Sequence, residues 1–236
     1  MEDKAAPVKE RISWIPLELN PDVWNKLIHE NGVDKTWAFN DIYGFDPESL
    51  GLIPQPVSAI IFVYPTMTET DLKFRKQEEQ RILKEGQFLG PNVMHFKQTI
   101  YNACGMMALI HLLANNRALL TGPGVFREIV EQADGMTVDQ RIKLLENNKR
   151  LAYVHEIAGK DGQTNAPAPE AEVDVHYVCF TDTDDHLYEL DGDKPFPINH
   201  GLCTDLVKDT ARVIRQIMER DPNEKNFSAM ALSRLG

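Results

Sequence analysis

Apolar and polar residues alternate along the first half of the chain in patterns that predict two helices and a buried strand. Residues 20–32 predict a helix, because Asn20 suits the N-cap, Pro21 the first helical position and Gly32 the end. Asp46-Pro47 predicts a second, short helix. Residues 57–64 are apolar on both faces, which is typical of a buried strand. Residues 69–85 are mostly charged and predict a solvated helix or a mobile loop.

The middle of the chain predicts a strand followed by a central helix. Residues 93–100 have a strand-like composition, and residues 103–115 are nearly all apolar. A helix that is apolar all round lies in the core, and Asn102 is its natural N-cap. Further helices are expected to begin at Gly122-Pro123 and at Thr137, where Thr137 and Gln140 form a capping box.

The second half predicts a loop, two paired strands, a helix and a final strand. Residues 158–172 contain no large apolar side chain, and a loop of this length suggests a function. Strands are expected at 173–180, 186–191 and 226–233, and a helix at 204–219. With residues 1–12 as a loose tail, the pattern predicts a single α+β domain over residues 13–236.

Composition narrows the function classes. The 236 residues carry a formal charge of −11 and are 42% hydrophobic, as in ordinary globular proteins. The acidic balance argues against nucleic acid and suits a partner that presents Lys and Arg, although it also simply favours solubility. The longest apolar run, residues 57–64, is far shorter than the about 20 residues of a membrane helix, and no secretory signal is visible. Three cysteines form no disulfide framework, so we expect a reducing compartment, cytoplasm or nucleus.

The three cysteines differ in their expected reactivity. Cys104 falls in the first turn of the apolar helix, where free N–H groups stabilise a thiolate, although a plain core cysteine fits equally well. Cys179 lies in a strand pattern and Cys203 in a loop without an obvious partner. The sequence contains no zinc-binding spacing and no phosphate-binding glycine motif, so we expect no metal site.

A cysteine nucleophile needs a base, an orienting group and oxyanion donors. If the strands around residues 182–185 form a hairpin with Asp182 opposite Asp185, His176 lies directly opposite Asp191, with Cβ atoms about 5 Å apart. A slip of one residue would send Asp191 to the other face. Gln98 could add its side-chain amide to the N–H of Cys104 as an oxyanion donor. Taken singly, a turn aspartate, a solvated glutamine and a core histidine at His111 are the simpler interpretations.

The octapeptide QTIYNACG, residues 98–105, resembles the active-site segment of the ubiquitin C-terminal hydrolase family of papain-like cysteine peptidases. The resemblance extends over most of the chain, and Gln98, Cys104, His176 and Asp191 follow the family's order, at separations of six, 72 and 15 residues. Further segments that resemble family landmarks are WIPLELNP (14–21), DIYG (41–44), LIHLLANN (109–116), VHY (175–177), LYELDG (187–192) and NFSAMAL (226–232).

The resemblance implies a papain-like fold with a knotted backbone, and a thiol hydrolase acting at the C-terminal glycine of ubiquitin. It implies Cys104 as nucleophile, His176 as base, Asp191 as the orienting group and Gln98 in the oxyanion hole, with no cofactor. It also implies a crossover loop at 158–172 that admits only small leaving groups, and ubiquitin contacts at Pro16, Leu17, Glu18, Leu19, Asn20, Pro21 and Glu224. We expect a monomer with ubiquitin as partner and its relative NEDD8 as a second candidate substrate. A ubiquitin-binding module with little turnover and a Cys-His-Asp acyltransferase are the alternatives.

Overall fold

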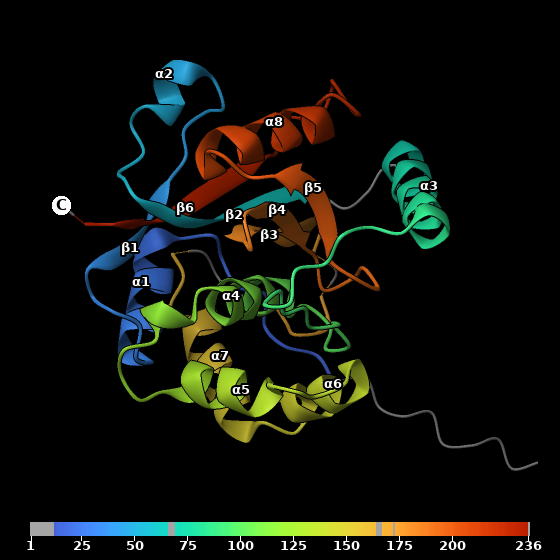
Figure 1. Cartoon of the computed structure of the whole chain (residues 1–236). Helices are drawn as coiled ribbons and strands as arrows, with labels where there is room; N and C mark the ends of the chain where they lie inside the picture. Colours follow the sequence, from blue (N-terminus) through green and yellow to red (C-terminus); the bar gives the residue numbers. More distant parts are fainter. Residues whose placement is uncertain (1–11, 66–68, 164–166, 172, 236) are drawn as a thin grey trace, which may run out of the picture.

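The computed structural model describes residues 12–65, 69–163, 167–171 and 173–235, and it confirms the predicted α+β class (Figure 1). A six-stranded sheet runs through the molecule in the order β1-β6-β2-β3-β4-β5, and each neighbouring pair is antiparallel. The strands are β1 (Trp37–Asp41), β2 (Val57–Pro65), β3 (Val175–Thr183), β4 (His186–Leu190), β5 (Ile198–Leu202) and β6 (Ser228–Arg234). The helices are α1 (Pro21–Glu30), α2 (Pro47–Leu50), α3 (Glu69–Glu85), α4 (Cys104–Asn115), α5 (Val125–Ala133), α6 (Val138–Glu146), α7 (Lys149–Lys160) and α8 (Leu206–Met218), with a 3-10 turn at Arg117–Leu119.

Helices cover both faces of the sheet, so the apolar side chains of β2 are buried on both sides. Side chains of Ala59 and Ile61 enter the larger core, which also holds α4. Ile60 and Phe62 point the other way, into a smaller core with α8. This alternation follows from the pleat of a strand, and it places α4 against β3 on one face and α8 on the other (Figure 1).

Sequence signals located most helix starts correctly. The side chain of Asn20 caps α1, that of Asp46 caps α2, and Thr137 and Gln140 form the expected capping box of α6. The pattern missed β1, α7 and β5. Helix α7 continues to Lys160 and therefore occupies the start of the predicted loop 158–172. Of the predicted tail, only Ile12 is described, and its carbonyl accepts a hydrogen bond from the N–H of Tyr101.

The predicted strand at residues 93–100 is wrong, because side chains of α4 take the place of a neighbouring strand. The Asn115 side chain bonds both backbone groups of Met94 at 2.8 Å, and Nε2 of His111 accepts from the N–H of Phe96 at 2.9 Å. These contacts satisfy an extended backbone without a ladder. The expected N-cap role of Asn102 is also wrong: Ala103 occupies the N-cap, and no side chain caps α4.

The β3–β4 hairpin is formed as expected, but its register differs by two residues. Thr183 pairs with His186, so the turn consists of Asp184 and Asp185, both with positive φ angles. Aspartate tolerates this left-handed conformation, and two such residues make the tight turn that suits a right-twisted hairpin. A shift of two residues keeps every side chain on its predicted face. Pairing with β3 ends at Leu190, so His176 and Asp191 are not ladder partners.

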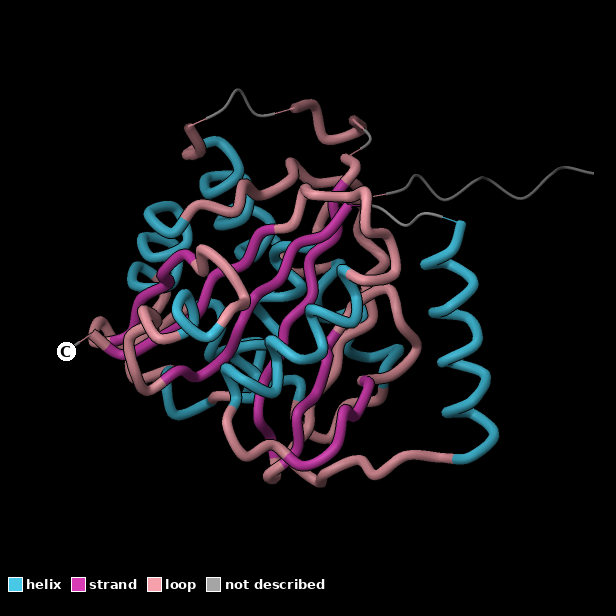
Figure 2. Tube along the Cα trace, turned by 90° about the horizontal axis from the view of Figure 1, so that it is seen from above, coloured by secondary structure: helices cyan, strands magenta, loops and turns pink. Residues whose placement is uncertain are grey.

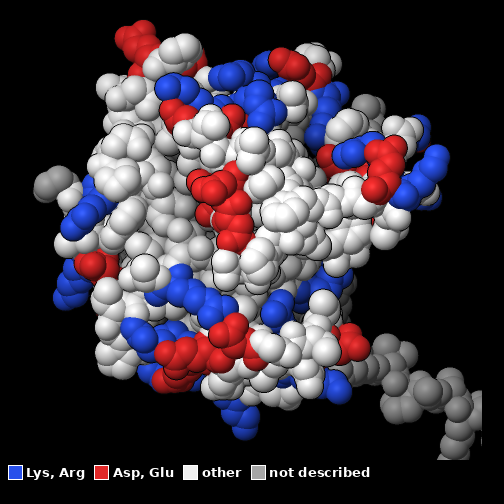
Figure 3. Space-filling model, in the orientation of Figure 1, with Lys and Arg blue, Asp and Glu red and all other residues white. Residues whose placement is uncertain are grey.

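The charges are unevenly distributed over the surface. On the face in Figure 3, Asp and Glu side chains gather in a central patch, whereas Lys and Arg lie mainly above and below it.

Within the described residues, no helix has the length and apolar character needed to span a membrane. Helix α3 lies beside the rest of the molecule, at one edge of the view in Figures 1 and 2.

Three buried histidines predict a fold that loses stability in mild acid. His155 is 1% exposed on α7 and bonds the carbonyl of Ile15 through Nε2. Burial lowers the pKa of His155 from 6.5 to about 4, and burial also lowers the pKa values of His95 and His111. At these three positions the folded state binds fewer protons than the unfolded chain, so their contribution to stability is complete above about pH 6.5 and is lost as pH falls toward 4.

His155→Phe should flatten part of this dependence. His155 alone accounts for at most about 3 kcal/mol of the change in unfolding free energy. Urea unfolding at several pH values measures the slope, with His186→Gln at the β3–β4 turn as control. An unchanged slope in His155→Phe would show that this imidazole is not held neutral.

Candidate active site

Cys104 is the first residue of α4, and its surroundings leave the helix terminus open. It is half-buried, and no side chain caps the N–H groups of the first turn. These groups and the helix dipole favour a negative charge at this position. The next residue, Gly105, lets the chain 14–21 approach closely, because a Cβ there would lie 3.2 Å from Cβ of Leu17. The N-terminal segment therefore packs against the first turn of α4.

The other two thiols lie in settings that keep them protonated. Cys179 is fully buried in β3, and burial raises its pKa. Burial, followed by the nearby carboxylate of Asp182, raises the pKa of Cys203 to about 12. Since the thiolate is the reactive form, neither cysteine is suited to be a nucleophile.

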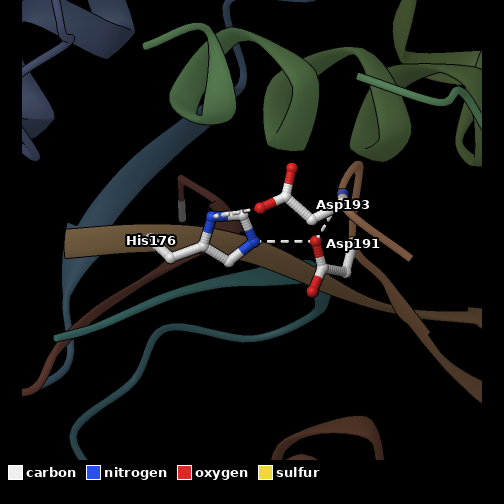
Figure 4. Close-up of side chains that lie close together, drawn as sticks. All are labelled: His176, Asp191 and Asp193. Carbon is white, nitrogen blue, oxygen red and sulfur yellow. Dashed lines mark hydrogen bonds and ion pairs between the residues drawn. The ribbon is translucent and has the colours of Figure 1, made fainter. Parts of the chain in front are cut away.

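His176 and Asp191 form a buried pair (Figure 4). Nε2 of His176 lies 2.7 Å from Oδ1 of Asp191, and the two residues are 5% and 0% exposed. His176 stands in β3 opposite Tyr64 of β2, and the tyrosine ring meets the imidazole edge to face at 5.7 Å. Because Asp191 engages Nε2, the other ring nitrogen, Nδ1, is left for proton exchange.

Asp193 and Cys104 both act on the imidazole, and Asp193 faces its Nδ1 side. Oδ2 of the half-exposed Asp193 lies 3.7 Å from Nδ1. The Cys104 thiol lies close enough to the imidazole to raise the pKa of His176. Burial opposes a charged imidazole, but Asp191 and Cys104 outweigh burial and hold the pKa of His176 well above its usual value. The site therefore favours an imidazolium beside the Cys104 sulfur.

Asp191 is an anion whose oxygens are fully used. Oδ1 accepts from His176 and, at 2.8 Å, from the backbone N–H of Asp193, and Oδ2 accepts from Nη2 of Arg75 at 2.5 Å. Burial opposes this charge, but His176 and Arg75 hold the pKa of Asp191 well below its usual range. His176, Asp191 and Asp193 also lie close enough together to hold a metal ion. The existing bonds of Asp191 leave it poorly suited to be a ligand.

Gln98 is placed by backbone contacts. Its N–H donates to the carbonyl of Gly192 at 2.8 Å, and a Cβ on Gly192 would lie only 2.8 Å from Cβ of Gln98. The side-chain Oε1 of Gln98 is buried and has no partner among the described residues. Gln98 is thus held near the 191–193 turn, and its side-chain oxygen makes no hydrogen bond within the described residues.

Both ends of the loop 158–172 are attached beside the site. Nδ2 of Asn102 donates to the carbonyls of Pro169 and Ala171, each at 2.9 Å. Near the other end, Asp161 pairs with Lys26, and the N–H of Gln163 donates to Glu18. Residues 164–166 and 172 lie outside the described part of the chain.

The residues implied as ubiquitin contacts fall into two groups. Leu17 and Asn20 are buried: the Leu17 carbonyl accepts from Tyr177, and Asn20 caps α1. Side chains that are partly accessible belong to Pro16, Glu18, Leu19, Pro21 and Glu224. Glu224 stands apart, in the turn after α8, where its carboxylate accepts two backbone N–H groups.

Neither Arg75 nor Asp193 is predicted from the sequence to lie at the His176–Asp191 pair. Arg75 is one charge in a highly charged segment, and only its place on the buried side of α3 distinguishes it. Asp193 follows Asp191 by two residues, so the correct turn geometry was needed to bring both to one imidazole.

Comparison with known proteins yields a consistent set of relatives. The family model described as ubiquitin carboxyl-terminal hydrolase, family 1, matches residues 14–219. A probable ubiquitin carboxyl-terminal hydrolase of Dictyostelium discoideum is 38% identical over 229 residues, which cover 95% of this chain and 89% of that protein. Human ubiquitin carboxyl-terminal hydrolase isozyme L1 is 37% identical over 221 residues, 92% of this chain and 96% of that protein.

A solved structure shows the same fold. The catalytic domain of Trichinella spiralis UCH37, crystallised with ubiquitin vinyl methyl ester, matches with a TM-score of 0.72 at 22% identity and covers 94% of this chain and 95% of that one. The expected peptidase fold is thereby confirmed, while the backbone knot stays a prediction.

Asp191→Asn should make the Cys104 thiol less reactive at neutral pH. Without the carboxylate the pKa of His176 falls, so the neutral thiol–imidazole pair replaces the thiolate–imidazolium pair. We expect alkylation by iodoacetamide at pH 7 to slow about tenfold or more.

Asp185→Asn removes the same charge at the hairpin turn, where asparagine tolerates the positive φ. This control should keep the parent's alkylation profile. If Asp191→Asn also keeps it, Asp191 does not set the charge state of His176.

Proposed function

The chain belongs to the ubiquitin carboxyl-terminal hydrolase family 1, a family of cysteine-type ubiquitinyl hydrolases, and from that premise we propose that Cys104 cleaves small adducts from the C-terminal glycine of ubiquitin. The observation that carries this assignment is the buried His176–Asp191 pair, 2.7 Å apart, beside the open N-terminus of α4. A reactive thiol needs both features, a base and a site that stabilises the thiolate.

The proposed reaction uses Nδ1 of His176 for each proton transfer. The Cys104 thiolate attacks the glycine carbonyl carbon, and the imidazolium then protonates the departing amine as the C–N bond breaks. This leaves a thioester between Cys104 and the glycine, with His176 neutral. His176 next removes a proton from water, which attacks the thioester and releases the carboxylate and the thiol. Asp191 holds the imidazole in one tautomer throughout.

The oxyanion of each tetrahedral intermediate needs donors placed in advance. The N–H of Cys104 lies at the uncapped start of α4, and the bond to Gly192 holds Gln98 beside the turn that follows Asp191. We assign these two groups to the oxyanion. In this role the Nε2 group of Gln98 donates to the oxyanion, because the amide oxygen can only accept hydrogen bonds.

The loop 158–172 is proposed to limit the size of the leaving group. Its described ends are attached to Asn102, two residues before Cys104, and to Glu18. We propose that the loop crosses over Cys104, so that a substrate tail must pass beneath or through it. A peptide or small amine can pass, whereas a folded protein such as a second ubiquitin cannot. The enzyme would then act on short adducts and only slowly on di-ubiquitin.

The partner is proposed to be ubiquitin, whose C-terminal tail carries two arginines that suit an acidic protein. Leu17 and Asn20 support the segment 16–21 from within, so its accessible side chains, those of Pro16, Glu18, Leu19 and Pro21, are the proposed contacts. NEDD8 as a second substrate, a monomeric state and a cytoplasmic or nuclear location belong to the same proposal.

Cys104→Ala should abolish hydrolysis of a fluorogenic ubiquitin C-terminal amide, a loss of about 1000-fold or more. Ubiquitin binding, measured by calorimetry, should persist, because the surface around the thiol is unchanged. Cys203→Ala is the matched control and should keep full turnover. Binding without turnover in the parent protein would instead select a ubiquitin-binding module, and the absence of both binding and turnover would reopen the assignment.

Several Gly/Ser residues inserted after Gly162 should raise di-ubiquitin cleavage and leave the fluorogenic amide rate nearly unchanged. Added loop length costs little closure entropy, so the fold should tolerate it. The ratio of the two rates, measured by gel and by fluorescence, reports the effect. A ratio equal to the parent's would mean that the loop does not restrict the substrate.

A further inference from the structure

Arg75 connects α3 to the catalytic pair through a closed ring of four side chains. Its Nη2 lies 2.5 Å from Oδ2 of Asp191, and its Nη1 donates to the Tyr64 hydroxyl at 2.8 Å. The Tyr64 ring contacts His176 edge to face, and His176 bonds Oδ1 of Asp191. Each member thus touches two others, and the guanidinium side chain is only 8% exposed.

Helix α3 otherwise has few buried residues. Among its described side chains, Arg75 and Ile82 are buried, at 7% and 5% exposure, and Glu78 pairs with Lys194 at 3.2 Å. The helix lies at the edge of the molecule in Figures 1 and 2. A mainly solvated helix therefore delivers one cation into the most buried part of the site.

We propose that Arg75 is a positioning residue for the hydrolysis: by binding Oδ2 of Asp191 it fixes the carboxylate so that Oδ1 faces Nε2 of His176. This inference rests on the proposed function of Cys104, His176 and Asp191. A guanidinium suits the role because its two nitrogens reach the carboxylate and the tyrosine in one plane. Lysine carries its donors on one nitrogen and lacks two nitrogens held apart in a plane, so it matches the carboxylate and the hydroxyl less well.

Other charges surround the ring and must be considered with it. Lys194 follows the 191–193 turn, where it binds Glu189 and Glu78. Lys97 donates to the carbonyl of Asp193, and the carboxylate of Asp193 faces Nδ1 of His176. None of these groups bonds Oδ2 of Asp191 in the described structure, so Arg75 supplies that contact alone.

A buried ion pair by itself says little about stability or catalysis, so the test must separate positioning from folding. We expect Arg75→Met to lower kcat for the fluorogenic ubiquitin amide about 10- to 100-fold, with KM nearly unchanged. Arg75→Lys should recover only part of this loss. Glu78→Gln, which weakens the other polar attachment of α3 without touching Asp191, is the matched control and should keep the parent kcat.

The decisive measurement is a double-mutant cycle with Asp191→Asn. If Arg75 acts through Asp191, Arg75→Met should cost much less in the Asp191→Asn background than in the parent. Equal losses in both backgrounds would overturn the proposal, and so would a full kcat in Arg75→Met. Tyr64→Phe keeps the packing, removes one partner of Arg75 and should give a smaller loss of the same kind, which covers the case in which Arg75→Met does not fold.

The proposed hydrolase function is tested separately from the positioning role of Arg75. Cys104→Ala tests the nucleophile whatever Arg75 does. Loss of activity in Cys104→Ala together with a full kcat in Arg75→Met would reject the positioning role and leave the hydrolase intact. Activity that survives Cys104→Ala would reject the hydrolase assignment itself.

Discussion

The buried carboxylate of Asp191 is the constraint around which the site is built. A fully buried anion is costly unless charges and hydrogen bonds compensate it from every side. Here β3 contributes His176, α3 contributes Arg75, and the chain itself contributes the N–H of Asp193. Three separate segments must therefore reach this point before the carboxylate is satisfied, which fixes the position of the imidazole.

The backbone around Asp191 holds the oxyanion side of the site as well. Nε2 of His95 bonds the carbonyl of Asp191 at 2.8 Å, and the N–H of Gln98 bonds the carbonyl of Gly192. Since His111 and Asn115 of α4 anchor the same extended segment, the helix that carries Cys104 also determines where Gln98 lies. Nucleophile, oxyanion donor and orienting carboxylate thus share one set of contacts.

Local signals in the sequence were enough for the elements that depend on local chemistry. Asn20, Asp46 and Thr137 cap their helices as expected, and β2 is apolar on both faces because two helical layers cover it. The strand predicted at residues 93–100 is wrong because side chains of α4, and no neighbouring strand, bond its backbone. A local pattern of residues does not reveal such a partner. The family resemblance was carried by motifs around Cys104 and His176, which are short and contiguous.

The hairpin shows why a wrong register still led to the correct pair. The two-residue shift preserved the face of each side chain, so Asp191 stayed on the side of His176. The contact between Asp191 and His176 is made after the pairing of β3 with β4 ends, in a turn. The alternating pattern of a strand does not predict the geometry of that turn. The role of Arg75 could not be predicted from the sequence, because no local pattern shows which residue in a run of charged residues is buried.

The geometry of Asp191 also means that α3 and the imidazole cannot move independently. One oxygen serves His176 and the other serves Arg75, and the two oxygens are rigidly joined through one carbon. A rotation that improves one bond worsens the other, so the carboxylate has a narrow range of orientations in which both are made. Tyr64 restricts the orientation of the carboxylate further, because the tyrosine hydroxyl contacts Arg75 and the tyrosine ring contacts His176. The alignment of the base is thereby set jointly by the central strands and by a helix at the edge of the fold.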